Sequence, residues 1–457
     1  MILITVGLLI LIYCFCNFRK GTYLFIFYQV FWCPGMTLLK MGESTVTMGL
    51  AMSTGYLIIY VLKFGINKQH YLQKEQFPFK RPFLLLSFSY LLSCFFAVGS
   101  FTGEITRAVS IIFQELLVIW ALWYVVTTEK DLKRLTKGMT ILFALAGVYG
   151  LIEYALKYNA IVLAKSKYVE EGIKLYSDTV EATMRGYRVL SFFEHPIGAG
   201  MTMALFAIFI LTMRVSFNRK MSDPYRLIAY VGVGLCIVCV FLSKMRSAII
   251  FLLIGILGVI DFKKRKFWKI AFFSIVIFII VLPLVKDNLS IIASMFNQEA
   301  AKSVGGSTIS MRIEQWNAVL NLFKMSPFAG LGEKFDSVLS NVYIQQARGF
   351  ESIWFLSLAR HGIVGTLGNI YLLYYSIIKI PREYSSKQAM FLGLAFWITN
   401  TITTIPSFRL TLYYLLYFYF IRIGKMGCPA FNTLKCTPCQ GQFEFSGLHS
   451  AGYSEII

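Results

Sequence analysis

Apolar segments of about twenty residues follow one another along almost the whole chain, and this pattern limits the possible fold more than any other feature. Of 457 residues, 57% are hydrophobic and 15% are charged, whereas soluble domains carry roughly 25% charged residues. A membrane-spanning helix needs about 20 apolar residues, and lipid admits only helices or closed barrels. Because the segments are continuous runs and not short alternations, helices are favoured over a barrel. The sequence therefore predicts an all-α polytopic membrane protein.

About twelve or thirteen spans are predicted, with boundaries uncertain by several residues. The second is doubtful because Pro34 and Gly35 interrupt it. The predicted spans are residues 2–17, 22–39, 45–62, 82–100, 107–126, 139–156, 198–214, 226–242, 247–261, 269–285, 353–379, 387–405 and 408–423.

The formal net charge of +21 is explained by the loops between spans. Lys and Arg collect in the cytoplasmic loops of membrane proteins, and no basic patch lies on a soluble module, so nucleic acid is not an expected partner. Placing the basic loops in the cytoplasm puts two long polar loops together on the extracytoplasmic face. The predicted organisation is 1–156 (N-terminal spans), 157–197 (first extracytoplasmic loop), 198–285 (central spans), 286–352 (large extracytoplasmic loop with amphipathic helices), 353–423 (C-terminal spans) and 424–457 (cytoplasmic tail).

The first extracytoplasmic loop ends in residues suited to anion binding and proton transfer. Arg185 and Arg188 lie three residues apart, and guanidinium groups hold phosphate through paired hydrogen bonds. Glu194 and His195 follow, and both side-chain types serve acid–base chemistry. The plainer alternatives are interfacial anchors for the arginines and ordinary surface positions for the other two.

Lys244 and Arg246 lie in a short turn that the predicted topology places on the extracytoplasmic face, where positive charge is disfavoured. Costly charges at a membrane boundary tend to be functional, which favours an anion contact there; the plainer alternative is an interfacial anchor. Arg312 and Trp316 share one face of a predicted amphipathic helix in the large loop. That helix also has a plainer interpretation, as a surface helix with an aromatic anchor.

Glu351 lies where the large loop meets the next predicted span. A partly desolvated carboxylate there could act as a base, although a helix-start carboxylate is also favoured by the helix dipole. The pattern Pro327-x-x-Gly330-x-Gly332 indicates close backbone approach. Cysteines in the tail lack the regular spacing of a zinc site, so neither a metal nor a cofactor is predicted.

Taken in order, these elements resemble the O-antigen ligase and O-antigen polymerase superfamily over roughly residues 180 to 370. The matching elements are Arg185 to Pro196, Leu242 to Ala248, Arg312-x-x-x-Trp316, Pro327-x-x-Gly330-x-Gly332, a polar residue at Glu351, and Gly362-Ile363-Val364-Gly365. Ligases of the superfamily carry a His where this chain has Glu351-Ser352, a departure that favours the polymerase. Met245 also replaces the Ser commonly found before the Arg of the turn.

The resemblance implies a glycosyltransferase of the bacterial inner membrane, active on its extracytoplasmic face. It would polymerise repeat units carried on undecaprenyl diphosphate, for O-antigen, capsule or exopolysaccharide synthesis. The ligase would instead transfer the finished chain to lipid A core. The implied partners are the undecaprenyl-diphosphate-linked oligosaccharide, membrane lipid and a chain-length regulator protein.

The hypothesis for the mechanism is attack of an acceptor hydroxyl on the anomeric carbon while undecaprenyl diphosphate leaves. Fixed cations can stabilise that leaving group without a metal. The candidates are Arg185, Arg188, Arg246 and Arg312 for the diphosphate, Glu351 as the base with Glu194 or His195 as alternatives, and Trp316, Tyr187 and Trp354 for stacking on sugars.

A transporter or lipid-glycan flippase is the main alternative from another class. Such a protein needs charged residues along a path through its spans. The predicted spans are nearly free of charge, and exceptions such as Glu115 and Glu153 are too few to line a path. A structural scaffold would leave the clustered arginines unexplained.

Overall fold

The computed structural model describes ten segments of the chain, and all structural statements here concern these. They are residues 2–31, 36–41, 44–65, 76–126, 128–166, 186–213, 223–260, 309–335, 350–404 and 408–427. The predicted span at 269–285, Arg185 and the Cys-bearing tail beyond residue 427 lie outside them.

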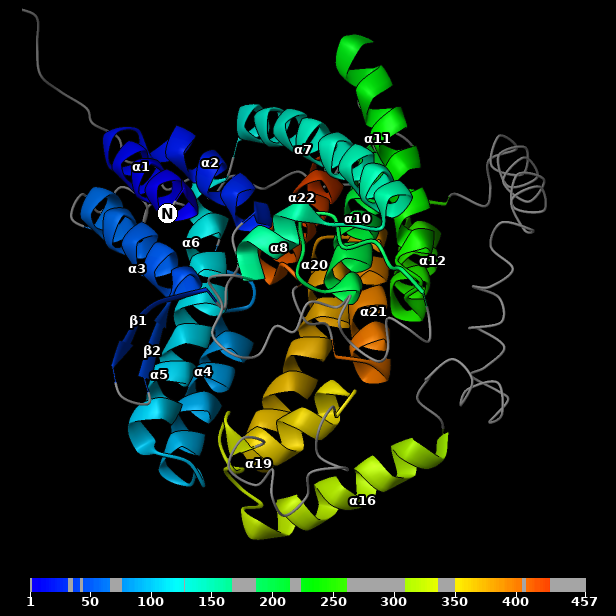
Figure 1. The fold of residues 1–457 in the computed structure, drawn as a ribbon. Coiled ribbons are helices and arrows are strands. Elements are labelled where there is room, and N and C mark those ends of the chain that lie inside the picture. Colours follow the sequence, from blue (N-terminus) through cyan, green and yellow to red (C-terminus); the bar gives the residue numbers. More distant parts are fainter. Residues whose placement is uncertain are drawn as a thin grey trace, which may run out of the picture.

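The described part is almost entirely helical (Figure 1). The α-helices are α1 (Ile2–Cys16), α2 (Phe18–Phe31), α3 (Met48–Tyr60), α4 (Lys80–Phe95), α5 (Phe101–Ile111), α6 (Val118–Val125), α7 (Glu129–Leu156), α8 (Ala160–Ser166), α10 (Pro196–Leu211), α11 (Asp223–Leu242), α12 (Arg246–Val259), α16 (Ile309–Met325), α19 (Ile353–Tyr374), α20 (Ile380–Glu383), α21 (Lys387–Ile402) and α22 (Leu410–Gly427). Short π-helical stretches continue three of them, namely η1 (Val61–Gly65), η2 (Ile112–Leu117) and η6 (Tyr375–Lys379).

Four of the described helical segments are long and apolar enough to cross a membrane: Phe101–Val125, Lys130–Leu156, Tyr225–Leu242 and Ile353–Glu383. Four shorter apolar helices accompany them, at Leu3–Cys16, Met48–Phe64, Pro196–Leu211 and Arg246–Val259. These findings confirm the predicted all-α polytopic class. The total of twelve or thirteen spans stays a prediction.

The second predicted span, 22–39, differs from the structure. Helix α2 ends at Phe31, and two strands, β1 (Thr37–Met41) and β2 (Ser44–Thr47), follow as an antiparallel hairpin. A proline inside a helix removes a backbone hydrogen bond and would clash with the preceding turn, so the sequence Cys33-Pro34-Gly35 disfavours a helix that continues to residue 39. Thr45, Val46 and Thr47 are β-branched and favour the strand.

Helix α10 forms the centre of the bundle, and every residue from Pro196 to Ile210 is buried. A helix that is apolar on all sides is stable only when it is surrounded, and α11, α12 and α7 pack on it. A Cβ at Gly200 would meet Ala248 of α12 at 2.7 Å, and one at Gly255 would meet Ile208 of α10 at 2.1 Å. Both contacts require that α10 and α12 run in the same direction.

Helices α12 and α21 pack in opposite directions. Gly258, near the end of α12, lies against Phe391, near the start of α21, and Lys387 Nζ donates to the Ile260 carbonyl oxygen at 2.9 Å. The first residue of α12, Arg246, and the last of α21, Ile402, therefore lie at the same end of this helix pair.

Helix α19 bends at Gly362, whose backbone angles (φ 60°, ψ −152°) are not helical. The loop that follows α16 fills this bend. Ile363 N donates to the Pro327 carbonyl at 2.8 Å, while Leu331 N donates to the Ala359 carbonyl at 2.9 Å. The glycines predicted to allow close backbone approach do so, because a Cβ at Gly330 would lie 2.3 Å from the Arg360 carbonyl carbon.

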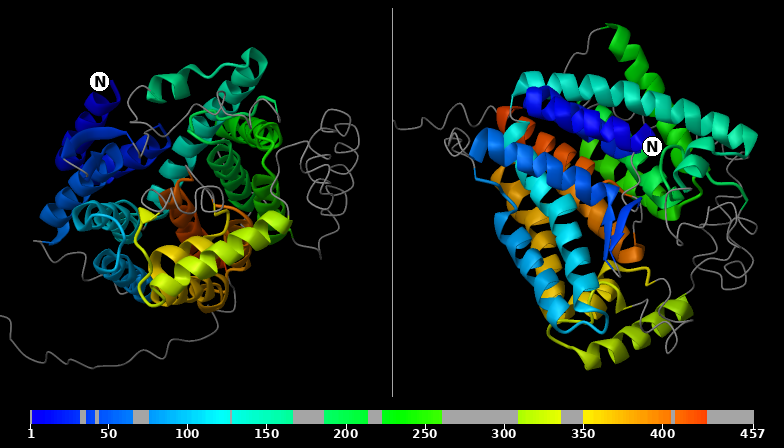
Figure 2. Two further views of the ribbon diagram at one scale, coloured as in Figure 1. Left: turned by 60° about the horizontal axis from the view of Figure 1, so that its bottom comes forward. Right: turned by 60° about the vertical axis from the view of Figure 1, so that its left-hand side comes forward.

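The predicted amphipathic helix is confirmed as α16, which lies across the end of the bundle opposite α7 (Figures 1 and 2). Its buried side chains Ala318, Val319 and Leu322 pack in a small apolar cluster with Phe350 and Ala359. Helix α16 is thereby fastened to the part of α19 that precedes the bend. From the bend to Glu383 remain about the 20 residues that a span requires.

Candidate functional site

The segment that carries Arg188 is held by one buried carboxylate at the end of α7. Glu153, fully buried, accepts hydrogen bonds from Tyr187 Oη at 3.0 Å, Leu190 N at 2.9 Å and Ser191 N at 2.6 Å. A carboxylate that accepts backbone N–H groups fixes a loop strongly. It also stabilises Ser191 in a left-handed conformation (φ 51°), which is costly for a residue with a Cβ.

Arg188 lies against the turn between α11 and α12. Its Nη1 donates to Met245 Sδ at 3.2 Å, and Val189 N donates to the Leu242 carbonyl at 3.3 Å. The side chain of Arg188 is only 2% exposed. The structure thus brings together two arginine-bearing segments, around Arg188 and Arg246, that the sequence separates by more than fifty residues.

Lys244 lies in the same turn in a left-handed conformation (φ 52°). Its ammonium group lies beside Gly186, where a built Cβ would be 3.3 Å from Lys244 Nζ. Gly186 itself has φ 68°, a value that glycine adopts readily. The predicted topology puts Lys244 on the face of the membrane where positive charge is disfavoured. The structure places it among the candidate cations.

His195 forms the N-cap of α10, and its Nδ1 accepts from Ile197 N at 3.2 Å. Burial first, and then the neighbouring Arg188 charge, lower the pKa of His195 to about 4. The ring is therefore neutral at pH 7. Since Nδ1 accepts a hydrogen bond, the neutral ring carries its proton on Nε2. His195 is thus suited to donate a hydrogen bond from Nε2 and less suited to accept a proton there.

Arg312 of α16 donates to the Glu351 carboxylate and to the Ile402 carbonyl oxygen at the end of α21. The side chains of Arg312 and Glu351 are 25% and 31% exposed, so a reactant can reach both. Because Ile402 lies at the Arg246 end of α12, this ion pair is at the same end of the bundle as Arg188 and His195.

Glu194 lies in a buried ion cluster. Its carboxylate pairs with Lys165 Nζ at 2.9 Å and Arg409 Nη2 at 3.1 Å, with all three side chains at most 4% exposed. Burial alone would raise the pKa of Glu194, but Arg409 and Lys165 outweigh it and lower that pKa. This arrangement fits a carboxylate that joins α8, α10 and α22 better than one that accepts a proton.

The three aromatic candidates have different surroundings. Trp316 is 42% exposed, with its ring 5.6 Å from that of Phe355. Trp354 stacks on Trp397 at 5.6 Å and donates from Nε1 to Thr401. Tyr187 is tied to Glu153 through its hydroxyl. Trp316 is the candidate with the largest open surface.

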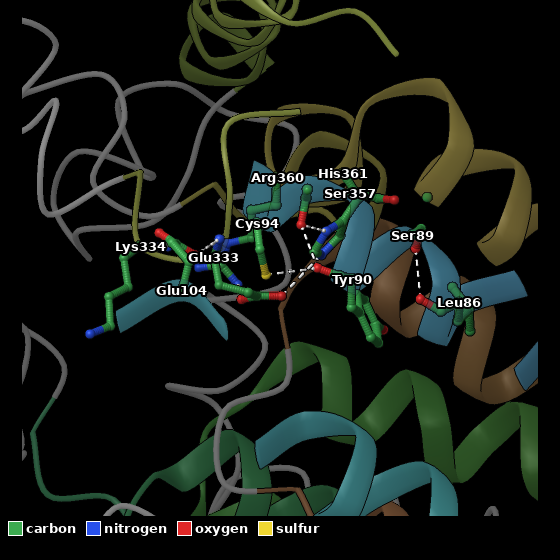
Figure 3. Close-up of polar contacts among 12 residues, drawn as sticks. Leu86, Ser89, Tyr90, Cys94, Glu104, Glu333, Lys334, Ser357, Arg360 and His361 are labelled. Carbon is green, nitrogen blue, oxygen red and sulfur yellow. Dashed lines mark hydrogen bonds and ion pairs between the residues drawn. The ribbon is translucent and has the colours of Figure 1, made fainter. Parts of the chain in front are cut away.

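Sequence reasoning missed a second polar network, around Glu333 (Figure 3). Glu333 pairs with Arg360 Nη1 and with His361 Nε2, each at 3.0 Å. Burial would raise the pKa of Glu333, but Arg360 and the His361 hydrogen bond bring it far below its usual range. Glu104 of α5 accepts from Glu333 N at 2.7 Å and from Lys334 N at 2.9 Å. The sequence signal was the acidic residue directly after the Gly-x-Gly pattern.

The predicted site residues fall into one assembled group and several supporting positions. Arg188, His195, Arg246, Arg312 and Glu351 gather at one end of the α10, α12 and α21 bundle, while Arg185 lies outside the described residues. In the described segments, no three His, Cys, Asp or Glu side chains are grouped so as to hold a metal ion.

The fold and the site together define the class of protein: a helical membrane protein with clustered cations at one end of its bundle. Residues 231–370 match the family model described as O-antigen ligase. The matched stretch runs from within α11 to near the end of α19 and contains Arg246, Arg312 and Glu351. This match over part of the chain supports a relationship to the O-antigen ligase and polymerase superfamily, and to glycan transfer in general. No curated protein shows a significant match to the chain.

Proposed function

We propose that this protein polymerises lipid-linked oligosaccharide repeat units at the extracytoplasmic face of the bacterial inner membrane. The observation that carries the proposal is the convergence of Arg188, Arg246 and Arg312 at one end of the bundle. Together with the family match, this convergence supports a site for a polyanion joined to a glycan. Undecaprenyl diphosphate is the polyanionic carrier that the resemblance implies.

In the proposed reaction, a hydroxyl oxygen of the acceptor glycan attacks the anomeric carbon of the donor glycan. A new glycosidic C–O bond forms as the bond from that carbon to the diphosphate oxygen breaks. The bonding electron pair leaves with undecaprenyl diphosphate, and the hydroxyl proton passes to a base. Charge grows on the diphosphate during this step, so fixed cations aimed at it lower the barrier.

Arg188, Arg246 and Arg312 are the proposed diphosphate ligands, with Lys244 added by the structure and Arg185 proposed from the sequence alone. Guanidinium forks match phosphate oxygens and remain charged at every physiological pH. His195 would add a neutral hydrogen bond from Nε2. These groups supply the required positive charge themselves, which supports transfer without a metal.

Glu351 is the proposed base. It stands at the start of α19 beside Arg312, so the proton acceptor and one diphosphate ligand occupy neighbouring positions. That proximity fits a reaction in which attack and departure occur at one carbon atom. Trp316 offers an exposed ring for a sugar face, and Trp354 and Tyr187 are further candidates near the same end.

The residue pair Glu351-Ser352 favours polymerase over ligase, because ligases of the superfamily carry a His there. A ligase acting on lipid A core remains the second candidate, supported by the family description itself. A flippase is less well supported, since Arg188, Arg246 and Arg312 gather at one end of the bundle.

Reconstitution with native substrate separates these functions. Purified protein in lipid nanodiscs is incubated with undecaprenyl-diphosphate-linked repeat units, with and without lipid A core, and with no added energy source. The proposal expects a ladder of lengthened lipid-linked chains in both samples. Transfer to lipid A core without a ladder would establish the ligase. Unchanged repeat units, under conditions where native membranes elongate them, would overturn the proposal.

A further inference from the structure

Three buried polar side chains near the start of α22 have side-chain atoms without a hydrogen-bond partner in the described part of the structure. The atoms without a partner are the amide nitrogen and oxygen of Gln29, the hydroxyl oxygen Oγ of Ser247 and the hydroxyl oxygen Oη of Tyr413. Gln29 is 2% exposed, Ser247 4% and Tyr413 1%. Since both the nitrogen and the oxygen of Gln29 lack partners, flipping its amide would change nothing.

Contacts link all three residues to one short stretch, Phe408 to Tyr413. Arg409 Nε donates to the Gln29 carbonyl oxygen at 2.7 Å, which brings α2 against the start of α22. Tyr413 follows Arg409 by one helical turn, and its ring lies 6.2 Å from that of Phe408. Phe408 also lies 6.2 Å from Phe251, which shares a face of α12 with Ser247 four residues earlier.

The same stretch adjoins the proposed diphosphate site. Ser247 follows Arg246 directly, and Arg409 pairs with Glu194, the neighbour of His195. Ser247 and Arg409 thus connect the three residues to the segments that carry the candidate cations. A sugar whose anomeric carbon is bonded to a diphosphate must place its ring next to the cations that hold the diphosphate.

Leaving such groups unpaired is costly. A buried polar group without a partner lowers stability by about 1–3 kcal/mol, and apolar residues of similar shape would avoid that cost. A chain that retains uncompensated polar groups at one place commonly does so for function. Amide and hydroxyl groups both donate and accept hydrogen bonds, and Phe251, Phe408 and Tyr413 supply aromatic faces.

We propose that Gln29, Ser247 and Tyr413 form a neutral subsite for the hydroxyl groups of the donor sugar that is attached to the diphosphate. This inference rests on the proposed function and names the sugar-binding part of the same site. The three groups are closed off in the present conformation, so occupation requires movement of the side chains that cover them.

Near-isosteric apolar variants test the subsite: Gln29→Met, Ser247→Ala and Tyr413→Phe. Each is compared with the wild type for its melting temperature and for its equilibrium binding in nanodiscs. Two probes are used, undecaprenyl diphosphate and the same lipid carrying the native repeat unit. The proposal expects an unchanged or higher melting temperature, unchanged binding of the sugar-free lipid, and roughly tenfold weaker binding of the glycan-bearing lipid.

Asn369→Leu is the matched control, because the buried Asn369 amide already donates to Ser357 Oγ at 2.9 Å and to the Gly365 carbonyl at 3.3 Å. It should lower the melting temperature and leave the affinity for both lipids unchanged. If Gln29→Met does not yield folded protein, Tyr413→Phe, which removes a single oxygen atom, carries the test.

Two negative outcomes are distinguishable. Equal affinity of wild type and variants for the glycan-bearing lipid, in a wild type that elongates chains, would overturn the subsite alone. A wild type that neither binds nor elongates the glycan-bearing lipid would overturn the proposed function and the subsite with it.

Discussion

Arg312 and Glu351 form an ion pair that joins α16 to the start of α19, with the same guanidinium also donating to the carbonyl oxygen of Ile402. One of these residues was predicted from the sequence as a diphosphate ligand and the other as a base. Their contact means that neither can be altered without changing the electrostatic surroundings of the other. Through Arg312, α16 is also joined to the end of α21.

Glu351→Gln should reduce the rate of chain elongation by roughly 10²- to 10⁴-fold, the usual contribution of a general base. Glutamine keeps a side-chain oxygen that can accept from Arg312, so the fold and substrate binding should be largely retained. The rate of ladder formation and the binding of undecaprenyl diphosphate are measured together. Elongation at the wild-type rate would remove Glu351 from the role of base.

Arg246→Ala should lower the elongation rate by about 10²-fold, and Arg246→Lys should restore part of it, because lysine keeps the charge without the fork. Arg382→Ala is the control, since that exposed side chain on α20 lies near the opposite end of α21. Single-turnover rates at saturating donor provide the measurement. Equal losses in Arg246→Ala and Arg382→Ala would argue against a specific anion contact.

His195 should make stability depend on pH. Its pKa is about 4 in the folded protein against about 6.5 for an unperturbed histidine. Between these values the unfolded chain binds more protons than the folded protein, so the free energy of unfolding is highest above pH 6.5. It decreases as the pH falls towards 4, by at most about 3 kcal/mol.

His195→Asn should flatten this dependence, since asparagine can still cap α10 but does not titrate. Melting temperatures of wild type and variant are recorded from pH 4 to 7.5 in detergent. As the pH falls from 7.5 to 4, the melting temperature of the wild type should decrease more than that of the variant. Parallel curves over the whole range would show that His195 does not titrate there.

Gly362→Ala should destabilise the protein by roughly 3 kcal/mol or more, because the left-handed conformation at the bend strains any residue with a Cβ. The added carbon would also lie 2.6 Å from the Phe328 carbonyl carbon. Gly234→Ala is the matched control: no atom lies within 4 Å of its built Cβ, and alanine favours the helix by up to about 1 kcal/mol. Melting temperatures should therefore shift downward only for Gly362→Ala.

Glu333→Gln should lower stability by about 3–5 kcal/mol, the usual effect of removing one partner from a buried ion pair. Arg360 would lose its counter-charge, and the contact that holds the loop after α16 to α19 would weaken. Glu383→Gln, at an exposed position of α20, should change stability little. The measurement is thermal unfolding of both variants, followed by circular dichroism. Equal stabilities of Glu333→Gln and Glu383→Gln would show that the Glu333 network does not contribute to stability.

The helical class and most helix positions could be predicted from the sequence, because lipid requires long apolar runs with internally paired backbones. Helix α16 was also predictable, since its apolar residues recur with helical period. The hairpin of β1 and β2 was not predicted, as short strands leave little periodic signal. The bend at Gly362 was not predicted either, because its backbone partners come from the loop around Pro327.

For the candidate site, the sequence alone determined the residue types: arginines, a histidine and carboxylates at the ends of apolar runs, where charge is costly to place. Only the tertiary structure decided which of them meet. Packing of α10 along α12, and of α12 against α21, brings Arg188, Arg246 and Arg312 to one end of the bundle. Glu194 gains its buried partners from α8 and from Arg409 before α22, and the Glu333 network forms where the loop after α16 meets α5 and α19. Such pairing of distant segments depends on helix direction and contact, which residue spacing does not encode.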